Sequence, residues 1–207
     1  MLETGAGGGC LNTPDAMSEL QAWEARYRCG ETGWDRGAPS PALMHWLEQM
    51  EPCRILVPGC GRGYEVVELA KRGFAVTAID IAPSAIAALK SFLAREQVHA
   101  RVIQADLFTH VAEPGYDMLY EQTCLCALEP ERRQAYAHLC RDWLRPGGRM
   151  FALFMQTGMP GGPPYHCDLL EMRQLFGESN WLWPDELPLF VPQRSGRFEL
   201  GYVLTRI

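Results

Sequence analysis

Three glycines and a cysteine stand together where an apolar run gives way to a helical pattern. Residues 54–70 read RILVPGCGRGYEVVELA, with Gly59, Gly61 and Gly63 alternating around Cys60. Glycines let the backbone turn tightly and let a ligand approach closely, because they carry no side chain. The free N–H groups at the start of the following helix then face that ligand. The pattern predicts either a nucleotide-type binding turn or a cysteine with a chemical role.

An acidic residue favours the binding turn. Asp80 ends the next apolar run, about where an acid that binds a ribose is expected. Its carboxylate can accept hydrogen bonds from both ribose hydroxyls, and such charge-assisted bonds are strong. A dinucleotide fingerprint, G-x-G-x-x-G, would place its third glycine at Tyr64. The spacing here is G-x-G-x-G, the form common in S-adenosylmethionine (SAM) methyltransferases.

Cys60 is the weaker candidate for chemistry. A nucleophile elbow needs small residues two positions on either side, where this chain has Pro58 and Arg62. The eight cysteines include no C-x-x-C pair, and Cys124 with Cys126 does not have a zinc-site spacing. The five histidines do not pair at helical spacing, so we expect no metal site.

Composition argues against several classes of partner. The net charge is −6 and no run of Lys or Arg is present, which argues against nucleic acid. The N-terminus lacks the basic start and apolar segment of a secretory signal, and no apolar stretch approaches the length of a membrane span. We expect a cytoplasmic protein with reduced cysteines that binds no membrane, as a monomer or weak homodimer.

The elements that would position the glycine turn alternate between apolar runs and amphipathic segments. Buried strands are predicted at residues 54–58, 75–80, 100–106, 116–122 and 149–156, with helices at 63–73, 83–97 and 131–144. Residues 191–207 alternate around a polar turn, which is typical of an antiparallel hairpin. We therefore expect an α/β fold: a Rossmann-like, doubly wound, mostly parallel seven-stranded sheet that ends in this hairpin.

The first part of the chain has a different character. Residues 1–16 are Gly-rich and aperiodic and are expected to form a disordered tail, followed by a single domain over residues 17–207. Ser18 and Gln21 match a capping box, and Gly30 is a good helix stop. Ser40 and Pro41 then start a second helix. Two helices are thus predicted within residues 17–52, ahead of the first strand.

Longer motifs make the chain resemble the thiopurine S-methyltransferase superfamily, especially its thiol and halide methyltransferase branch. The matching stretches are WEARYxxGETGWDRG at 23–37, LVPGCGRG at 56–63, AIDI at 78–81, ADLF at 105–108, YEQTCLCALEP at 120–130 and GGPPY at 161–165. The first and last are specific to the superfamily, and together they cover most of the chain. The resemblance implies a class I, SAM-dependent methyltransferase of small molecules, with the two N-terminal helices as a lid.

The resemblance also implies which residues bind SAM: Trp23, Tyr27, Trp34, Gly59, Gly61, Gly63, Asp80, Ile81, Asp106, Leu107 and Gln122. Trp23, Tyr27 and Trp34 would form an aromatic lid, because the sulfonium is a cation and aromatic faces attract cations by about 0.5–2 kcal/mol. Ordinary helix packing would explain Trp23 and Tyr27 equally well. Asp80 would bind the ribose, and Asp106 with Leu107 would contact the adenine.

The acceptor side is less well defined by the sequence. Tyr165 is a candidate to orient a small acceptor and His166 to deprotonate it. Relatives often have Trp at the position of Tyr27 and, in the thiol and halide branch, Tyr at that of Gln122, which leaves the acceptor's identity open. Pro58 also replaces an acid that many SAM enzymes carry before the glycine turn.

The function expected is transfer of a methyl group, by in-line displacement, to the sulfur of a small-molecule thiol or similar soft nucleophile. Methylation of a halide, a metalloid or a secondary-metabolite heteroatom stays open as an alternative. So do an NAD(P)-dependent oxidoreductase, which Tyr64 argues against, and a SAM-binding protein without catalysis. A nucleobase methyltransferase is rejected, because its [DN]-P-P-Y motif belongs after the fourth strand and PPY follows the fifth here.

Overall fold

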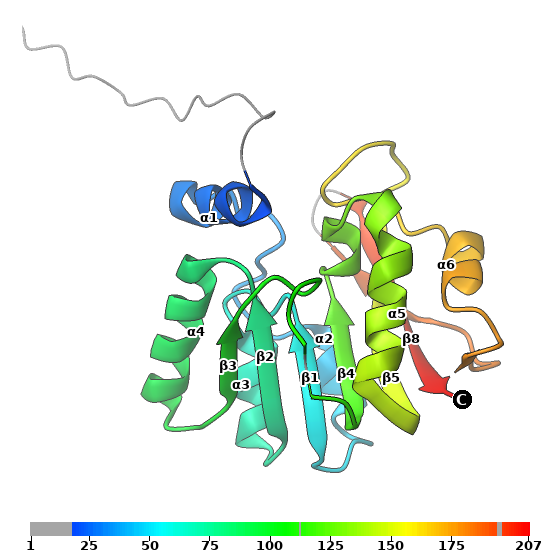
Figure 1. The fold of residues 1–207 in the computed structure, drawn as a ribbon, viewed down its shortest axis with the longest axis horizontal. Coiled ribbons are helices and arrows are strands. Elements are labelled where there is room, and N and C mark those ends of the chain that lie inside the picture. Colours follow the sequence, from blue (N-terminus) through cyan, green and yellow to red (C-terminus); the bar gives the residue numbers. More distant parts are fainter. Residues whose placement is uncertain (1–17, 112, 194–195) are drawn as a thin grey trace, which may run out of the picture.

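An eight-stranded sheet with helices on both faces forms the fold (Figure 1). The computed structural model describes residues 18–111, 113–193 and 196–207. The strands are β1 (Arg54–Pro58), β2 (Ala75–Asp80), β3 (Arg101–Gln104), β4 (Tyr116–Gln122), β5 (Leu144–Gln156), β6 (Trp181–Leu182), β7 (Leu189–Pro192) and β8 (Phe198–Arg206). The α-helices are α1 (Glu19–Cys29), α2 (Pro41–Trp46), α3 (Tyr64–Lys71), α4 (Pro83–Glu96), α5 (Arg133–Trp143) and α6 (Leu169–Leu175), with 3₁₀ turns η2 (Leu125–Ala127) and η3 (Pro130–Arg132).

The strand order reverses between β1 and β4. It runs β3-β2-β1-β4-β5-β8-β6, and β7 pairs with β8 outside this path. β1 to β5 are parallel, whereas β8 is antiparallel to β5, β6 and β7. In open α/β sheets, ligands bind beyond the carboxyl ends of the strands at such a reversal. The fold therefore places a binding crevice above β1 and β4.

The sheet separates two hydrophobic cores. On one face, α2, α3 and α4 pack on the sheet, with Val66 and Leu89 fully or almost fully buried. On the other face, α5 and α6 pack on residues such as Leu119 and Phe154, and Figure 1 shows α5 crossing that face. Successive strand residues alternate between the cores: Ile55 contributes to the first and Leu56 to the second. Burial of both faces explains why these strands read as continuous apolar runs.

The N-terminal helices take two different positions. α1 begins with the predicted capping box, in which Ser18 and Gln21 bond reciprocally, and ends at Gly30 with a φ of 72°. It contributes no buried residue and lies above the ends of the strands in Figure 1. α2 is shorter than predicted, and its Leu43 is fully buried while Trp46 packs against the ring of Phe151. α1 thus has the exposed position expected of a lid, whereas α2 belongs to the core.

The expected Rossmann-like sheet and its C-terminal hairpin are confirmed, with differences in detail. The sheet has eight strands rather than seven because Trp181–Leu182 pairs with the end of β8, and two residues are too few to give a sequence pattern. The predicted turn at residues 145–148 is a bulge within β5, since Leu144 pairs with Tyr116 and Arg149 with Met118. The helix α6 was not expected from the sequence. The predicted tail, residues 1–16, lies outside the described residues.

Phe154 gives a direct test of the second core. Its side chain is fully buried, and its ring centroid lies 5.7–6.3 Å from those of Phe176, Trp183 and Tyr202. Phe154→Ala should lower the free energy of unfolding by about 3–5 kcal/mol, because the cavity left behind cannot collapse fully. Urea denaturation measures this. Leu187→Ala, at a side chain that is 92% exposed, is the control and should change stability by less than about 0.5 kcal/mol.

Candidate functional site

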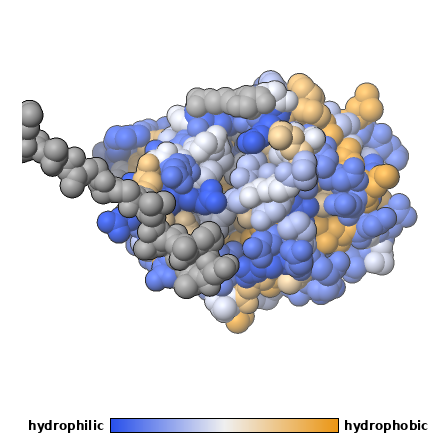
Figure 2. All heavy atoms as spheres, turned by 90° about the horizontal axis from the view of Figure 1, so that it is seen from above, coloured by the Kyte–Doolittle hydropathy of each residue, from blue (hydrophilic) through white to orange (hydrophobic). Residues whose placement is uncertain are grey.

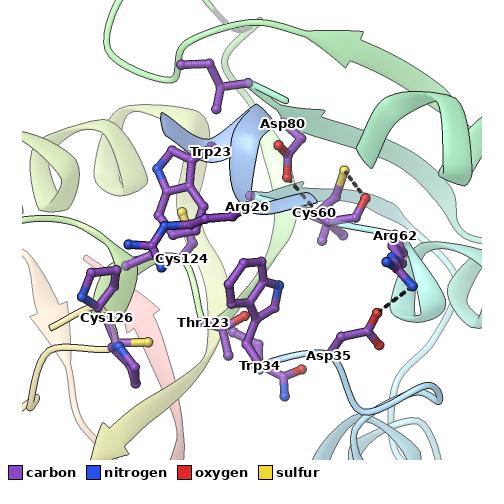
Figure 3. A pocket seen from close by; sticks show the side chains of 18 of the residues that line it. Trp23, Arg26, Trp34, Asp35, Cys60, Arg62, Asp80, Thr123, Cys124 and Cys126 are labelled. Carbon is purple, nitrogen blue, oxygen red and sulfur yellow. Dashed lines mark hydrogen bonds and ion pairs between the residues drawn. The ribbon is translucent and has the colours of Figure 1, made fainter. Parts of the chain in front are cut away.

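A cavity of about 520 Å³ lies at the carboxyl ends of the parallel strands (Figure 3). This volume falls within the range of roughly 300–1,000 Å³ typical of small-molecule sites. All eleven predicted SAM-binding residues line it: Trp23, Tyr27, Trp34, Gly59, Gly61, Gly63, Asp80, Ile81, Asp106, Leu107 and Gln122. The fold therefore brings these residues together from five separate segments of the chain.

The glycine turn forms the cavity wall between β1 and α3. Gly59, Gly61 and Gly63 have φ values of 57°, 53° and 77°, in the left-handed region that favours glycine. A Cβ on Gly59 would lie 2.8 Å from the Sγ of Cys124, and one on Gly63 would lie 2.2 Å from the side chain of Leu89. Both backbone conformation and space thus require glycine here. The turn can then present backbone N–H groups to a ligand at close range.

Asp80 links this turn to the next strand. One carboxylate oxygen accepts a hydrogen bond from the backbone N–H of Gly61 at 2.8 Å, and the other accepts one from Ala82 at 2.9 Å. Burial raises the pKa of this carboxyl, while the backbone hydrogen bonds oppose that rise. Two oxygens offer about four acceptor sites, so capacity for ligand hydroxyls remains. Asp106 forms a similar local turn by accepting from the N–H of Phe108 at 2.8 Å.

Aromatic rings from α1 and the loop after it cover one side of the cavity. The ring of Trp34 lies edge-on to those of Trp23 and Tyr27, at centroid distances of 5.5 and 5.6 Å. Figure 3 shows the side chains of Trp23 and Trp34 near each other at the cavity. The Arg26 guanidinium already stacks over Trp23, 5.3 Å from its centroid. Since one cation occupies a face of Trp23, Trp34 is the better placed ring for a second cation.

Polar contacts on two sides hold α1 in place over the cavity. The carboxylate of Glu24 accepts hydrogen bonds from the N–H and the hydroxyl of Ser84, at 2.9 and 2.6 Å. It thereby caps the N-terminus of α4, where Ala82 offers no side-chain cap. On the other side, Glu19 forms an ion pair with Arg132. α1, which contributes no buried residue, is therefore held by part-buried polar contacts.

A chain of polar side chains lies toward β4, β7 and β8. The hydroxyl of Tyr120 donates to Gln122 Oε1 at 2.9 Å, and Gln122 Nε2 donates to Glu199 Oε2 at 3.4 Å. Gln193 Nε2 donates to the same Glu199 oxygen at 2.6 Å. Tyr120, Gln122 and Gln193 line the cavity, and Glu199 is fully buried behind them. This network is on the side opposite the predicted nucleoside contacts, which come from β1, β2 and β3.

Two buried carboxyl groups in this half of the protein have raised pKa values. Burial raises the pKa of Glu199 to about 7, and the nearby charge of Glu65 adds to the effect. Burial likewise raises the pKa of Glu121 to about 7. Glu121 Oε1 accepts from the N–H groups of Cys124 and Leu125, so it shapes the turn that follows β4. Both carboxyls change charge near neutral pH.

Tyr165 and His166 are not among the residues that line the cavity. From the same loop, Pro163 and Pro164 do line it. The N–H of Tyr165 donates to the carbonyl of Cys126 at 2.7 Å. The Nδ1 of His166 accepts from the N–H of Thr157 at 3.1 Å, which requires that nitrogen to be unprotonated. These hydrogen bonds stabilise the loop that contains both residues. The catalytic roles of Tyr165 and His166 stay predictions.

The cysteines near the cavity have the environment of buried apolar residues. Burial raises the pKa values of the thiols of Cys60, Cys124 and Cys126, first of all by desolvation, so none is held as a thiolate. All three line the cavity, and Figure 3 shows Cys124 and Cys126 on its wall. Within the described part of the chain, no group of three or more His, Cys, Asp or Glu side chains could hold a metal ion.

Sequence reasoning missed Tyr120, Gln193 and Glu199. Tyr120 sits in an apolar strand, where a hydroxyl gives no separate signal. Gln193 lies in a polar stretch that predicts only a turn. Glu199 offered a signal that could have been used, because a carboxylate in a strand that is covered on both faces must find partners. Its partners, however, come from β4 and from the end of β7. Only the fold brings these segments next to Glu199, so the sequence does not identify the partners.

The surface around the site carries no single extended apolar face in the view of Figure 2. Seen from above, the described residues are mostly hydrophilic, and the hydrophobic patches are separate. None of the helices in the described ranges is long and apolar enough to cross a membrane.

Solved structures support the description of the fold. Magnesium protoporphyrin IX methyltransferase from Synechocystis PCC 6803, with bound SAM, matches with a TM-score of 0.73 at 14% identity, covering 94% of this chain and 100% of that one. The 1,6-didemethyltoxoflavin-N1-methyltransferase of Burkholderia thailandensis matches with a TM-score of 0.71 at 20% identity, covering 95% and 93%. At these identities the likeness shows the fold alone, which is that of Rossmann-like methyltransferases.

Sequence comparison then shows the family. The model of the thiopurine S-methyltransferase (TPMT) family matches residues 18–183. Thiocyanate methyltransferase 1 of Arabidopsis thaliana is 29% identical over 209 residues, covering 94% of this chain and 92% of the relative. Probable thiol methyltransferase 2 of the same plant is 33% identical over 166 residues, covering 77% and 74%. The chain belongs to the thiopurine S-methyltransferase family, which confirms the resemblance: it is a SAM-dependent methyltransferase.

The two buried carboxyls predict an unusual dependence of stability on pH. Their pKa rises on folding from 4.5 to about 7, so between these values the folded protein holds protons that the unfolded chain releases. The free energy of unfolding should therefore fall as pH rises from 5 to 8, by roughly 2 kcal/mol for each carboxyl. Urea denaturation at both pH values measures the change.

Glu121→Gln should reduce the change in the free energy of unfolding between pH 5 and pH 8 by roughly 2 kcal/mol, the contribution of one carboxyl. The matched control is Glu68→Gln, which removes a carboxylate paired with Arg72 on the surface of α3 and should leave the dependence as it is. Stability that rises between pH 5 and pH 8 would contradict the assignment of these two groups.

Proposed function

We propose that this protein transfers the methyl group of SAM to the sulfur of a small-molecule thiol inside the cavity. The observation that carries the proposal is the gathering of all eleven predicted SAM-binding residues around a cavity that continues beyond them. The same cavity is also lined by Gln193, Pro163, Pro164 and Met155, which in this proposal contact the acceptor. Relatives named thiol, thiocyanate and thiopurine methyltransferases support sulfur as the accepting atom.

The chemistry of the cavity wall fits an adenosyl amino acid. In this proposal Asp80 accepts hydrogen bonds from the ribose hydroxyls with the lone pairs that Gly61 and Ala82 leave free. Asp106 and Leu107 contact the adenine, and the glycine turn admits the amino-acid part. Bound SAM supplies an electrophilic methyl group on a positively charged sulfur, and the ring of Trp34 faces that charge.

Catalysis then depends on alignment and on exclusion of water. Well-oriented reacting groups can gain roughly 7–11 kcal/mol relative to free encounter, which is the main resource of such a site. α1 and the rings of Trp23 and Trp34 cover the cavity, while Pro163 and Pro164 narrow it from another loop. An aromatic thiol is partly ionised at neutral pH, so its sulfur can attack without a dedicated base.

A specific observation favours a second candidate acceptor. Arg36 and Arg197 both line the cavity, and a small inorganic anion would be attracted by positive charge there. The relative that matches over 94% of this chain is named a thiocyanate methyltransferase. Methylation of thiocyanate or a halide is therefore the alternative to thiol methylation.

A panel of acceptors distinguishes the two. With methyl-labelled SAM, we expect labelled methyl thioethers from aromatic thiols and labelled methanethiol from hydrosulfide, at higher kcat/KM than any product from thiocyanate or iodide. Transfer to the anions alone would favour the second candidate. Transfer to none of these acceptors, by protein that still binds S-adenosylhomocysteine, would contradict both and favour methylation of a secondary-metabolite heteroatom.

Asp80 tests the cofactor side. Asp80→Asn should weaken S-adenosylhomocysteine binding about tenfold or more, because hydrogen bonds to a charged group are lost. Isothermal titration calorimetry measures the affinity. The matched control is Asp117→Asn at the start of β4, whose carboxylate accepts from Arg54 and Arg145 away from the cavity. Equal affinity in Asp80→Asn and wild type would exclude a ribose-binding role for Asp80.

A further inference from the structure

Glu199 is a buried carboxyl that the proposed function does not use. Its side chain is fully buried in β8, where it pairs across the sheet with Met155, a residue of the cavity wall. Oε2 accepts from the amides of both Gln193 and Gln122. Oε1 is buried and has no hydrogen-bond partner among the described residues. Burying a carboxylate costs free energy that its hydrogen bonds must offset.

The two amides that it contacts are on the acceptor side of the cavity. Gln122 is the last residue of β4, and Gln193 follows β7, whereas the predicted nucleoside contacts come from the other half of the sheet. Side-chain amides can present either their N–H groups or their oxygen to a ligand. If the NH₂ group of a glutamine side chain is hydrogen-bonded within the protein, its oxygen is left to face the acceptor, and the reverse also holds.

We propose that Glu199 is a positioning residue, whose carboxylate fixes the side-chain amides of Gln122 and Gln193 and so determines how the acceptor is held. This inference rests on the proposed function, because it concerns the same cavity. An ionised carboxylate can only accept hydrogen bonds, so both amides must direct N–H groups toward it. Gln122 Oε1 is then free to accept from the hydroxyl of Tyr120, as observed at 2.9 Å.

Protonation of Glu199 would remove this constraint. The protonated form carries one O–H donor, so the carboxyl no longer requires an N–H group from each amide. Its pKa lies at about 7, raised first by burial and lowered by the hydrogen bond from Gln193. The arrangement is therefore complete above about pH 7 and is lost as the pH falls below it. Neutral pH is where the acceptor side should change.

The charged and titratable groups around Glu199 come from several elements. Arg36, in the loop after α1, lowers its pKa, and Glu65 of α3 raises it. Glu199 in turn raises the pKa values of Tyr120, Glu121, Cys126 and Cys167, which lie in or beside β4, η2 and α6. Glu121 also titrates near pH 7, so a test must separate the two carboxyls.

The side-chain amide signals of the two glutamines give a readout that needs no acceptor. In ¹⁵N-labelled protein bound to S-adenosylhomocysteine, the Gln122 and Gln193 NH₂ resonances should shift together between about pH 5.5 and 8.5, with a midpoint near 7. Glu199→Gln should abolish the shift. The matched control, Glu121→Gln, should retain it. Amide signals that do not titrate, or that still titrate in Glu199→Gln, would overturn the proposal.

Kinetics with an electron-poor aromatic thiol, ionised over the whole pH range, separates positioning from proton uptake. Glu199→Gln should raise the KM for the thiol about tenfold at pH 8, the effect of one lost hydrogen bond to a charged group. Its kcat should stay within about twofold of wild type. Glu199→Asp keeps the charge, so its KM for the thiol should lie between those of wild type and Glu199→Gln, and this KM should still change with pH. An unchanged KM in Glu199→Gln would contradict the proposal.

A second variant covers the case in which Glu199→Gln does not fold. Gln193→Leu removes one donor at the cavity wall, and the Gln122 amide should then still titrate while the KM for the thiol rises. The failure of this inference and that of the proposed function differ. Titrating amides in a protein that methylates no acceptor would refute the function but keep the positioning role. Methyl transfer to a thiol, with amide signals and a KM that Glu199→Gln does not change, would keep the proposed function and refute the positioning role.

Discussion

The carboxylate of Asp80 holds two chain segments together at the centre of the site. One oxygen binds the N–H of Gly61 in the turn after β1, and the other binds the N–H of Ala82 at the start of α4. Because these segments follow neighbouring strands, the contact fixes the shape of the crevice where the strand order reverses. The same contacts fix the start of α4, where Ser84 donates to Glu24 of the lid helix.

The cavity is divided by the topology of the sheet. β1, β2 and β3 supply the glycine turn and the two aspartates, which suit a nucleoside with hydroxyl groups. β4, β5, β7 and β8 supply amides, prolines and a methionine, with a buried carboxyl behind them. The proposed function assigns the first half to the cofactor and the second half to the acceptor. This division explains why the class of the enzyme is clearer than its substrate.

The sequence predicts where the residues of the first half lie, because its signals are local. The capping box at Ser18, the alternating glycines and Asp80 at the end of an apolar run each reflect a short-range rule. The second half depends on contacts between distant segments: Gln122 and Glu199 are 77 residues apart, and no spacing rule connects them. For the same reason Tyr165 and His166 are natural candidates in the sequence, yet their hydrogen bonds are structural. The N–H of Tyr165 donates to Cys126, the ring of His166 accepts from Thr157, and the carbonyl of His166 accepts from Arg133 of α5. The short β6 and the core position of α2 were likewise set by tertiary packing rather than by local pattern.

A crystal structure with S-adenosylhomocysteine and an unreactive thioether analogue of the acceptor would test the central claim most directly. The account predicts the ribose against Asp80, the adenine beside Asp106 and Leu107, and the acceptor between Trp34, Gln122 and Gln193. The sulfur of S-adenosylhomocysteine should face that acceptor. An acceptor bound outside the cavity, or a nucleoside seated against Gln193 with Asp80 left to the backbone alone, would contradict the division of the site.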